Sequence, residues 1–151
     1  MTTNHYDVPV LIAGGGPVGM SLALDLNHMG TKCLVAEQDP GTAVVLLAKA
    51  GTLNERTMEY VRRWGLVDQV AAVFPPDLAR DTVYCTALDV YVLGRSETPS
   101  ANKRGTPLVG PEMLRRCGQH LFDPILANAA IASEHATVRY NLRFESFTQD
   151  A

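Results

Sequence analysis

Several features are scarce in this 151-residue sequence, and each scarcity excludes a class of protein. The three cysteines, Cys33, Cys85 and Cys117, suit neither a disulfide framework nor a metal site in number or spacing. No apolar run reaches the roughly 18 uninterrupted residues of a membrane span, and the N-terminal segment lacks the basic start of a secretory signal. We therefore expect a cytoplasmic protein with reduced thiols, no metal and no membrane partner.

An excess of positive charge is also missing. Thirteen basic residues stand against 16 acidic ones, the formal net charge is −3, and the few basic doublets are scattered. A nucleic-acid partner is not expected, because such surfaces gather Lys and Arg in one place. The composition, 46% hydrophobic and 19% charged, is that of an ordinary globular domain, so we predict one domain over residues 1–151.

The first forty or so residues carry the pattern of a strand, a helix and a second strand. Residues 7–13 are β-branched and apolar, which is typical of a strand buried on both faces of a parallel sheet. Residues 17–29 place apolar side chains at helical spacing and stop at Gly30. Residues 31–37 form another apolar run, closed by a turn at 38–41. Together they predict a βαβ unit.

The middle of the chain predicts a second, incomplete β-rich layer. Thr52 and Glu55 have capping-box spacing, which predicts a helix over 52–64, followed by a helical piece over 66–74. A hairpin is predicted over 82–93, and a loop follows it to residue 107.

The last third of the chain returns to helix and strand. A helix is predicted over 119–132, and apolar residues alternate with polar ones over 137–148 as in a strand with one solvated face. The predicted fold class is α/β, with residues 7–13, 31–37 and 137–148 in one parallel sheet.

Three glycines, Gly14 to Gly16, stand between the first strand and the first helix, and a fourth, Gly19, lies in the first turn of that helix. The spacing Gly14-x-Gly16-x-x-Gly19 is that of a dinucleotide-binding fingerprint. Gly14 would permit the tight turn, Gly16 the approach of a pyrophosphate and Gly19 close packing of the helix, whose positive end would face the anion. We expect Gly15 to add only conformational freedom. Glu37 lies 18 positions past Gly19, at the end of the second predicted strand, where a carboxylate can accept hydrogen bonds from ribose hydroxyls.

The chain resembles the opening segment of the FAD-dependent aromatic hydroxylases, the class A flavoprotein monooxygenases that include phenol, chlorophenol and 4-hydroxybenzoate hydroxylases. The likeness rests on "VPVLIAGGGPVGMSLALDLNHMGTKCLVAEQ", "AKAGTLNERTMEYVRRWGL", "LGRSETPS" and the run Arg-Cys-x-Gln-x-x-Phe-Asp-Pro-Ile-Leu over 116–126. It implies a Rossmann-like FAD-binding domain that is incomplete relative to the family, with the hairpin and loop of 82–107 reaching toward a substrate domain. It also implies NAD(P)H as reductant and a phenolic or other small aromatic substrate. A homodimer is an open alternative to a monomer.

The resemblance also implies roles for single residues. The ADP half of FAD would be held by Gly14, Gly16, Pro17, Gly19 and Glu37. Lys49, Ala50 and Arg56 would approach the flavin's phosphates or its edge, and Arg116 and Gln119 its ribityl chain. As alternatives, Arg56 would lie on a solvated helix face, Arg116 would be a surface charge, and Gln119 would only cap a helix. No catalytic residue and no metal ligand is assigned.

Two positions depart from the family pattern. Gln38 stands where many relatives have Arg after the ribose acid, and Gly51 stands where some phenol hydroxylases have an Asp that polarises the phenol. One charged contact to the nucleotide is thereby lost, and the sequence gives no support for phenol activation by that route.

Three functions stay open from the sequence. The chain is the FAD-binding portion of a monooxygenase, a truncated module that binds nucleotide or a partner without catalysis, or an NAD(P)-dependent reductase. Members of the resembled family continue beyond this length with further flavin-binding motifs. We therefore expect an incomplete active site, weak FAD binding and no hydroxylation by the chain alone.

Overall fold

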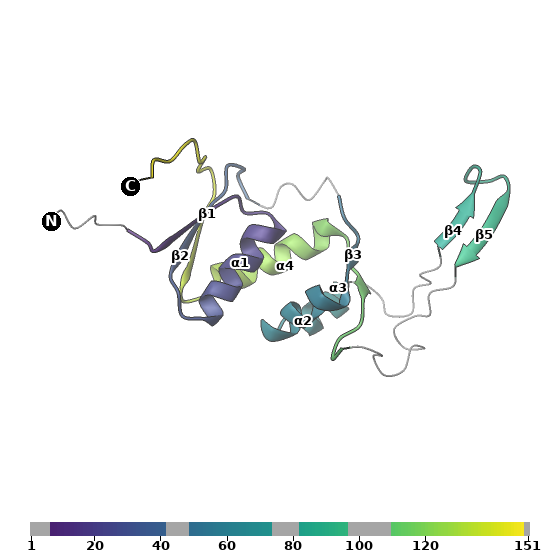
Figure 1. Cartoon of the computed structure of the whole chain (residues 1–151), viewed down its shortest axis with the longest axis horizontal. Helices are drawn as coiled ribbons and strands as arrows, with labels where there is room; N and C mark the ends of the chain where they lie inside the picture. The colour runs from purple at the N-terminus through teal and green to yellow at the C-terminus, as the bar shows by residue number, and fades with distance from the viewer. Residues whose placement is uncertain (1–6, 42–48, 74–81, 97–109, 150–151) are drawn as a thin grey trace. The chain divides into compact units, whose positions relative to one another are not determined.

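A small parallel sheet organises the first of two compact units in the computed structural model (Figure 1). The structure describes residues 7–41, 49–73, 82–96 and 110–149. One unit comprises residues 1–51 and 117–151, and the other comprises residues 52–116.

The sheet has the order β1-β2-β7 with both pairings parallel. Its strands are β1 (Val10–Ala13), β2 (Cys33–Ala36) and β7 (Ala136–Arg139). In register, Val10 lies opposite Cys33, and Cys33 lies opposite Ala136. The predicted βαβ unit and the parallel pairing of residues 7–13, 31–37 and the segment after 136 are confirmed.

Two helices lie on one side of this sheet (Figure 1). They are α1 (Pro17–His28) and α4 (Gln119–Ile131), which pack against each other. The core beneath them contains Met20, Val35 and Leu126, all almost completely buried. Burial of each such side chain contributes about 1.5–3 kcal/mol. This core fixes the ends of β1 and α1 between which the glycines lie.

The other face of the sheet is less covered than the sequence predicts. β2 is buried as expected, since Cys33, Val35 and Ala36 are all inaccessible. Leu11 on β1, however, is 51% exposed. The prediction that residues 7–13 are buried on both faces is wrong for the described part of the chain, because α1 and α4 cover the same side.

The final strand is shorter than predicted. β7 ends at Arg139, and Asn141 adopts a left-handed backbone with φ of 57°. The amides of Asn141 and Leu142 instead donate to the carbonyl oxygens of Asp39 (3.2 Å) and Glu37 (2.9 Å). The predicted strand over 137–148 is therefore wrong beyond Arg139, because the chain turns and is held against the loop after β2.

The unit of residues 52–116 contains two helices and two small antiparallel sheets. Its helices are α2 (Glu55–Arg63) and α3 (Val67–Val73). Its strands are β3 (Thr52–Leu53) paired with β6 (Arg115–Arg116), and β4 (Thr82–Cys85) paired with β5 (Val92–Ser96). The predicted hairpin and the helical piece after 66 are confirmed. Of the predicted segments, the last residue of the helical piece over 66–74 and the part of the loop from 97 to 107 lie outside the described residues.

Helix α2 starts at a different residue from the one the sequence predicts. Thr52 belongs to β3, and the cap is Asn54, whose Oδ1 accepts hydrogen bonds from the Thr57 amide (2.8 Å) and hydroxyl (2.9 Å). The capping box assigned to Thr52 and Glu55 is wrong, because Asn54 offers an equally good acceptor two residues later.

No helix within the described residues is long and apolar enough to cross a membrane.

Candidate dinucleotide-binding site

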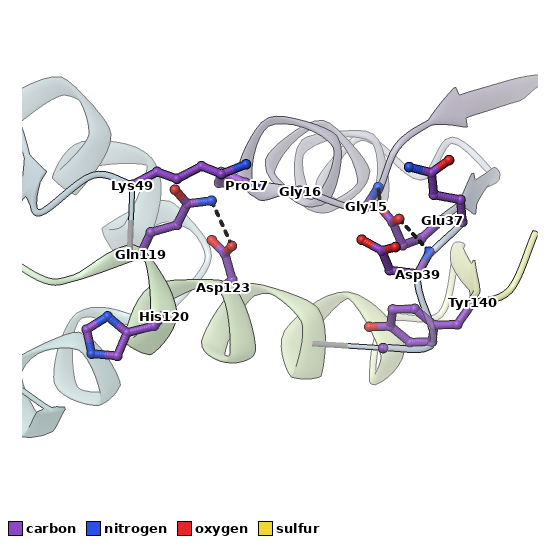
Figure 2. A pocket seen from close by; sticks show the side chains of 12 residues that line it. Gly15, Gly16, Pro17, Glu37, Asp39, Lys49, Gln119, His120, Asp123 and Tyr140 are labelled. Carbon is purple, nitrogen blue, oxygen red and sulfur yellow. Dashed lines mark hydrogen bonds between the residues drawn. The ribbon is translucent and has the colours of Figure 1, made fainter. Parts of the chain in front are cut away.

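A pocket of about 300 Å³ lies in the unit of residues 1–51 and 117–151. This volume is at the lower end of the range for small-molecule sites. One group of lining residues comes from the glycine turn, the loop after β2 and the end of β7: Gly15, Gly16, Pro17, Glu37, Gln38, Asp39, Gly41 and Tyr140. The other group is Lys49, Gln119, His120 and Asp123 (Figure 2).

The three fingerprint glycines differ in what a side chain would meet. Gly14 has a φ of +105°, which L side chains rarely adopt, so it makes the tight turn. A Cβ on Gly19 would overlap the carbonyl oxygen of Gly14. A Cβ on Gly16 would meet nothing within 4 Å, and its φ of −71° is ordinary. Gly14 and Gly19 are thus needed for the fold, whereas nothing in the described chain requires glycine at position 16.

Gly15 does more than add conformational freedom, and that expectation is wrong. Its amide donates a hydrogen bond of 2.6 Å to Oε2 of Glu37, and a Cβ on Gly15 would lie 2.9 Å from Cβ of Glu37. Glycine at this position lets the backbone of the turn approach the acid closely. The contact joins the turn after β1 to the residue that follows β2.

Glu37 is held with acceptor capacity to spare. Its second oxygen, Oε1, accepts a hydrogen bond of 2.9 Å from the Asp39 amide. An ionised carboxylate has about four acceptor positions, so each oxygen retains one after these two bonds. The two backbone amides therefore orient the carboxylate and leave it able to accept from two neighbouring hydroxyls.

At the other end of the pocket, Gln119 is tied to the segment before β3. Its backbone amide donates a hydrogen bond of 2.8 Å to the carbonyl oxygen of Ala50, and this bond holds Lys49 and Ala50 beside the start of α4. The cap of α4 is Gly118, and no side chain caps it. Nε2 of the Gln119 side chain instead donates a hydrogen bond of 3.0 Å to Oδ2 of Asp123. The alternative that Gln119 only caps a helix is therefore wrong.

Asp123 and Tyr140 were not among the residues that the sequence predicts for the site. Burial raises the pKa of Asp123, while the hydrogen bond from Gln119 and the charge of Lys49 oppose that rise. Burial, followed by the negative charge of Glu37, raises the pKa of Tyr140. The sequence does contain a signal for Asp123, because it lies one helical turn after Gln119 in the predicted helix. Tyr140 carries no such signal, because it occupies an apolar position in the alternating pattern of the predicted last strand.

Two predicted site residues, Arg56 and Arg116, belong to the unit of residues 52–116. Arg56 has a side chain that is 67% exposed and forms an ion pair of 2.7 Å with Glu59. Its guanidinium also lies over the Tyr60 ring, 4.9 Å from the centroid. Arg116 lies on β6 opposite Thr52 and is half-buried. Their roles toward a cofactor stay predictions.

Within the described ranges, no group of three or more His, Cys, Asp or Glu side chains is placed to bind a metal ion.

Comparison with known proteins identifies the same ligand class. Residues 7–151 match the family described as FAD binding domain. The chain is 33% identical over 152 residues to phenol 2-monooxygenase of Pseudomonas sp. (strain EST1001), covering 98% of this chain and 24% of that protein. It is 30% identical over 161 residues to tetracenomycin B2 monooxygenase-dioxygenase of Streptomyces olivaceus, covering 98% and 29%.

Solved structures agree with the sequence matches. The rebeccamycin biosynthetic enzyme RebC with reduced flavin superposes with a TM-score of 0.84 at 39% identity, covering 95% of this chain and 26% of that one. The flavin-dependent monooxygenase PieE in complex with FAD and substrate gives a TM-score of 0.81 at 32% identity, covering 95% and 25%. The chain thus spans about a quarter of the length of these relatives.

Proposed function

The chain belongs to the family of FAD-binding domains, and from this premise we propose that its pocket holds the ADP half of FAD for a flavin-dependent monooxygenase. The substrate class proposed is phenolic or other aromatic compounds, with NAD(P)H as the reductant. The relatives named above are monooxygenases, which supports this over a simple NAD(P)-dependent reductase. When bound, the flavin supplies the redox chemistry, and the protein binds and orients it.

One observation carries the proposal: the start of α1 is open above Gly16 and is faced by Glu37. No side chain caps this helix, and the space where a Gly16 side chain would stand is empty of described atoms. An uncapped helix start offers amide groups and a positive dipole end, both of which favour a pyrophosphate. The remaining acceptor positions of Glu37 fit the two adjacent hydroxyls of a ribose.

The other proposed contacts follow from the lining of the pocket. Pro17 begins α1 without an amide to satisfy, and Lys49 brings a positive charge that suits a phosphate. Gln119 would reach the ribityl chain from the start of α4. Arg56 and Arg116 stay proposed cofactor contacts on the strength of the family pattern alone.

The test is equilibrium titration of the purified chain with FAD, followed by flavin fluorescence and by the absorbance spectrum. Glu37→Gln is the matched variant, because an amide keeps the size but places a donor against the amides of Gly15 or Asp39. It should weaken binding by about 1–3 kcal/mol, or about 5- to 150-fold. A wild-type chain that binds no FAD would contradict the proposal and favour a partner-binding module.

A further inference from the structure

Two residues that line the pocket each have a buried polar atom with no hydrogen-bond partner among the described residues, His120 at Nδ1 and Asp123 at Oδ1. Oδ2 of Asp123 accepts from Gln119, but Oδ1 is inaccessible to solvent and has no hydrogen-bond partner among the described residues. Figure 2 shows this carboxylate rising from α4 beside the Gln119 amide, with Lys49 beyond that amide. A buried acceptor left without a donor destabilises the folded chain. The site is thus built to receive a donor that the described residues do not supply.

The same carboxylate decides which way the Gln119 amide points. An ionised carboxylate can only accept, so the NH₂ group of Gln119 must face Asp123. The amide oxygen of Gln119 is then turned away from Asp123. This end of the pocket is therefore lined by two residues with an acceptor that the Gln119–Asp123 hydrogen bond does not use, Oδ1 of Asp123 and Oε1 of Gln119.

The chemistry of these acceptors selects a part of the ligand. A pyrophosphate has only acceptor oxygens at neutral pH, so it is repelled by a carboxylate and suits the start of α1 and Lys49 instead. Hydroxyl groups can donate to both acceptors. FAD carries a row of hydroxyls on its ribityl chain, beyond the pyrophosphate as seen from the adenosine.

We propose that Asp123 is a binding residue for the ribityl chain of FAD, accepting a hydroxyl hydrogen bond at Oδ1 while Oδ2 holds Gln119 as a second acceptor. This inference rests on the proposed function. It places the cofactor in a direction along the pocket, with ribose at Glu37, pyrophosphate at Gly16 and polyol at Asp123. It also makes the α4 end of the pocket specific for a ligand with hydroxyls rather than for adenine nucleotides in general.

The experiment compares two ligands on the full chain. ADP has the adenosine and the pyrophosphate but no ribityl chain, so it reports on the Glu37 and Gly16 end alone. Asp123→Asn keeps the shape of the side chain and its acceptor for Gln119 but replaces the acceptor at Oδ1 by a donor. Glu145→Gln removes one negative charge at an exposed position that does not line the pocket and serves as the control for net charge.

We expect Asp123→Asn to weaken FAD binding about tenfold or more, to change ADP binding by less than about twofold, and Glu145→Gln to change neither. Unchanged FAD affinity in Asp123→Asn overturns the inference and leaves the proposed function standing. An equal loss of ADP and FAD affinity overturns it too, because the residue would then be only structural. A wild-type chain that binds neither ligand overturns the proposed function and the inference together.

Discussion

Replacement of Gly16 by alanine separates the needs of the fold from those of the ligand. The backbone at Gly16 has φ of −71° and ψ of −175°, which alanine adopts freely, and the added Cβ meets nothing within 4 Å. Loss of glycine's freedom in the unfolded chain should stabilise the variant by about 0.4–1 kcal/mol. Alanine is a poorer N-cap than glycine by a similar amount, about 0.5–1 kcal/mol. These two effects nearly cancel, so the free energy of unfolding should change by less than about 1 kcal/mol.

The ligand meets a different situation. A pyrophosphate at the start of α1 must come close to the Gly16 backbone, and the methyl group would occupy that approach. Forcing a close-packed contact apart typically costs about 1–3 kcal/mol, which corresponds to about 5- to 150-fold in the dissociation constant of FAD. The assay pairs FAD titration by flavin fluorescence with chemical denaturation of the same samples.

Gly19→Ala is the matched contrast, because its methyl group would overlap the carbonyl oxygen of Gly14. It should lower the free energy of unfolding by about 1–3 kcal/mol or more, with no ligand present. Wild-type FAD affinity in Gly16→Ala would refute the assignment of the pyrophosphate to the glycine turn. A Gly16→Ala chain destabilised as much as Gly19→Ala would refute the division of roles between the two glycines.

Three further predictions test particular contacts. Gly15→Ala should push the Glu37 side chain away, break the 2.6 Å hydrogen bond and lower both stability and FAD affinity; denaturation and titration that show no change would contradict the close approach. Asn54→Ala should destabilise α2 by about 0.5–2 kcal/mol, measured by denaturation, whereas Thr52→Ala should not show a cap loss. Burial raises the pKa of Asp123 above its ordinary 3.8, so the free energy of unfolding of the wild type should fall as the pH rises from below 3.8 through that raised pKa. Asp123→Asn should lack this fall. Melting temperatures that change with pH in parallel for both proteins would contradict the prediction.

The part of the fold that the sequence predicts well is local. The βαβ unit follows from two apolar runs, a helical repeat and glycines at fixed spacing, all within about 30 residues. The hairpin of β4 and β5 follows from alternation over neighbouring residues. In each case the signal and the structure it specifies lie close together in the chain.

The features that the sequence does not predict depend on distant partners. Asn141 ends β7 because its amide and that of Leu142 bond to the carbonyls of Asp39 and Glu37, about a hundred residues earlier, as the numbering shows. Gly15 is required because Glu37 lies against it, and no pattern within the glycine turn states this. Leu11 is exposed because α1 and α4 pack on the same side of the sheet, which the sequence around Leu11 does not determine. The cap of α2 differs from these cases, because Thr52 and Asn54 are both good N-cap residues and the local sequence does not decide between them.

The central claim, that FAD lies along the pocket from Glu37 to Gln119, is tested most directly by an NMR titration of the ¹⁵N-labelled chain with FAD. FAD bound in this pocket should produce saturable shifts of the backbone amides of Gly15, Gly16 and Asp39 and of the side-chain amide of Gln119. Shifts confined to residues outside this pocket, or no shifts at saturating FAD, would contradict it.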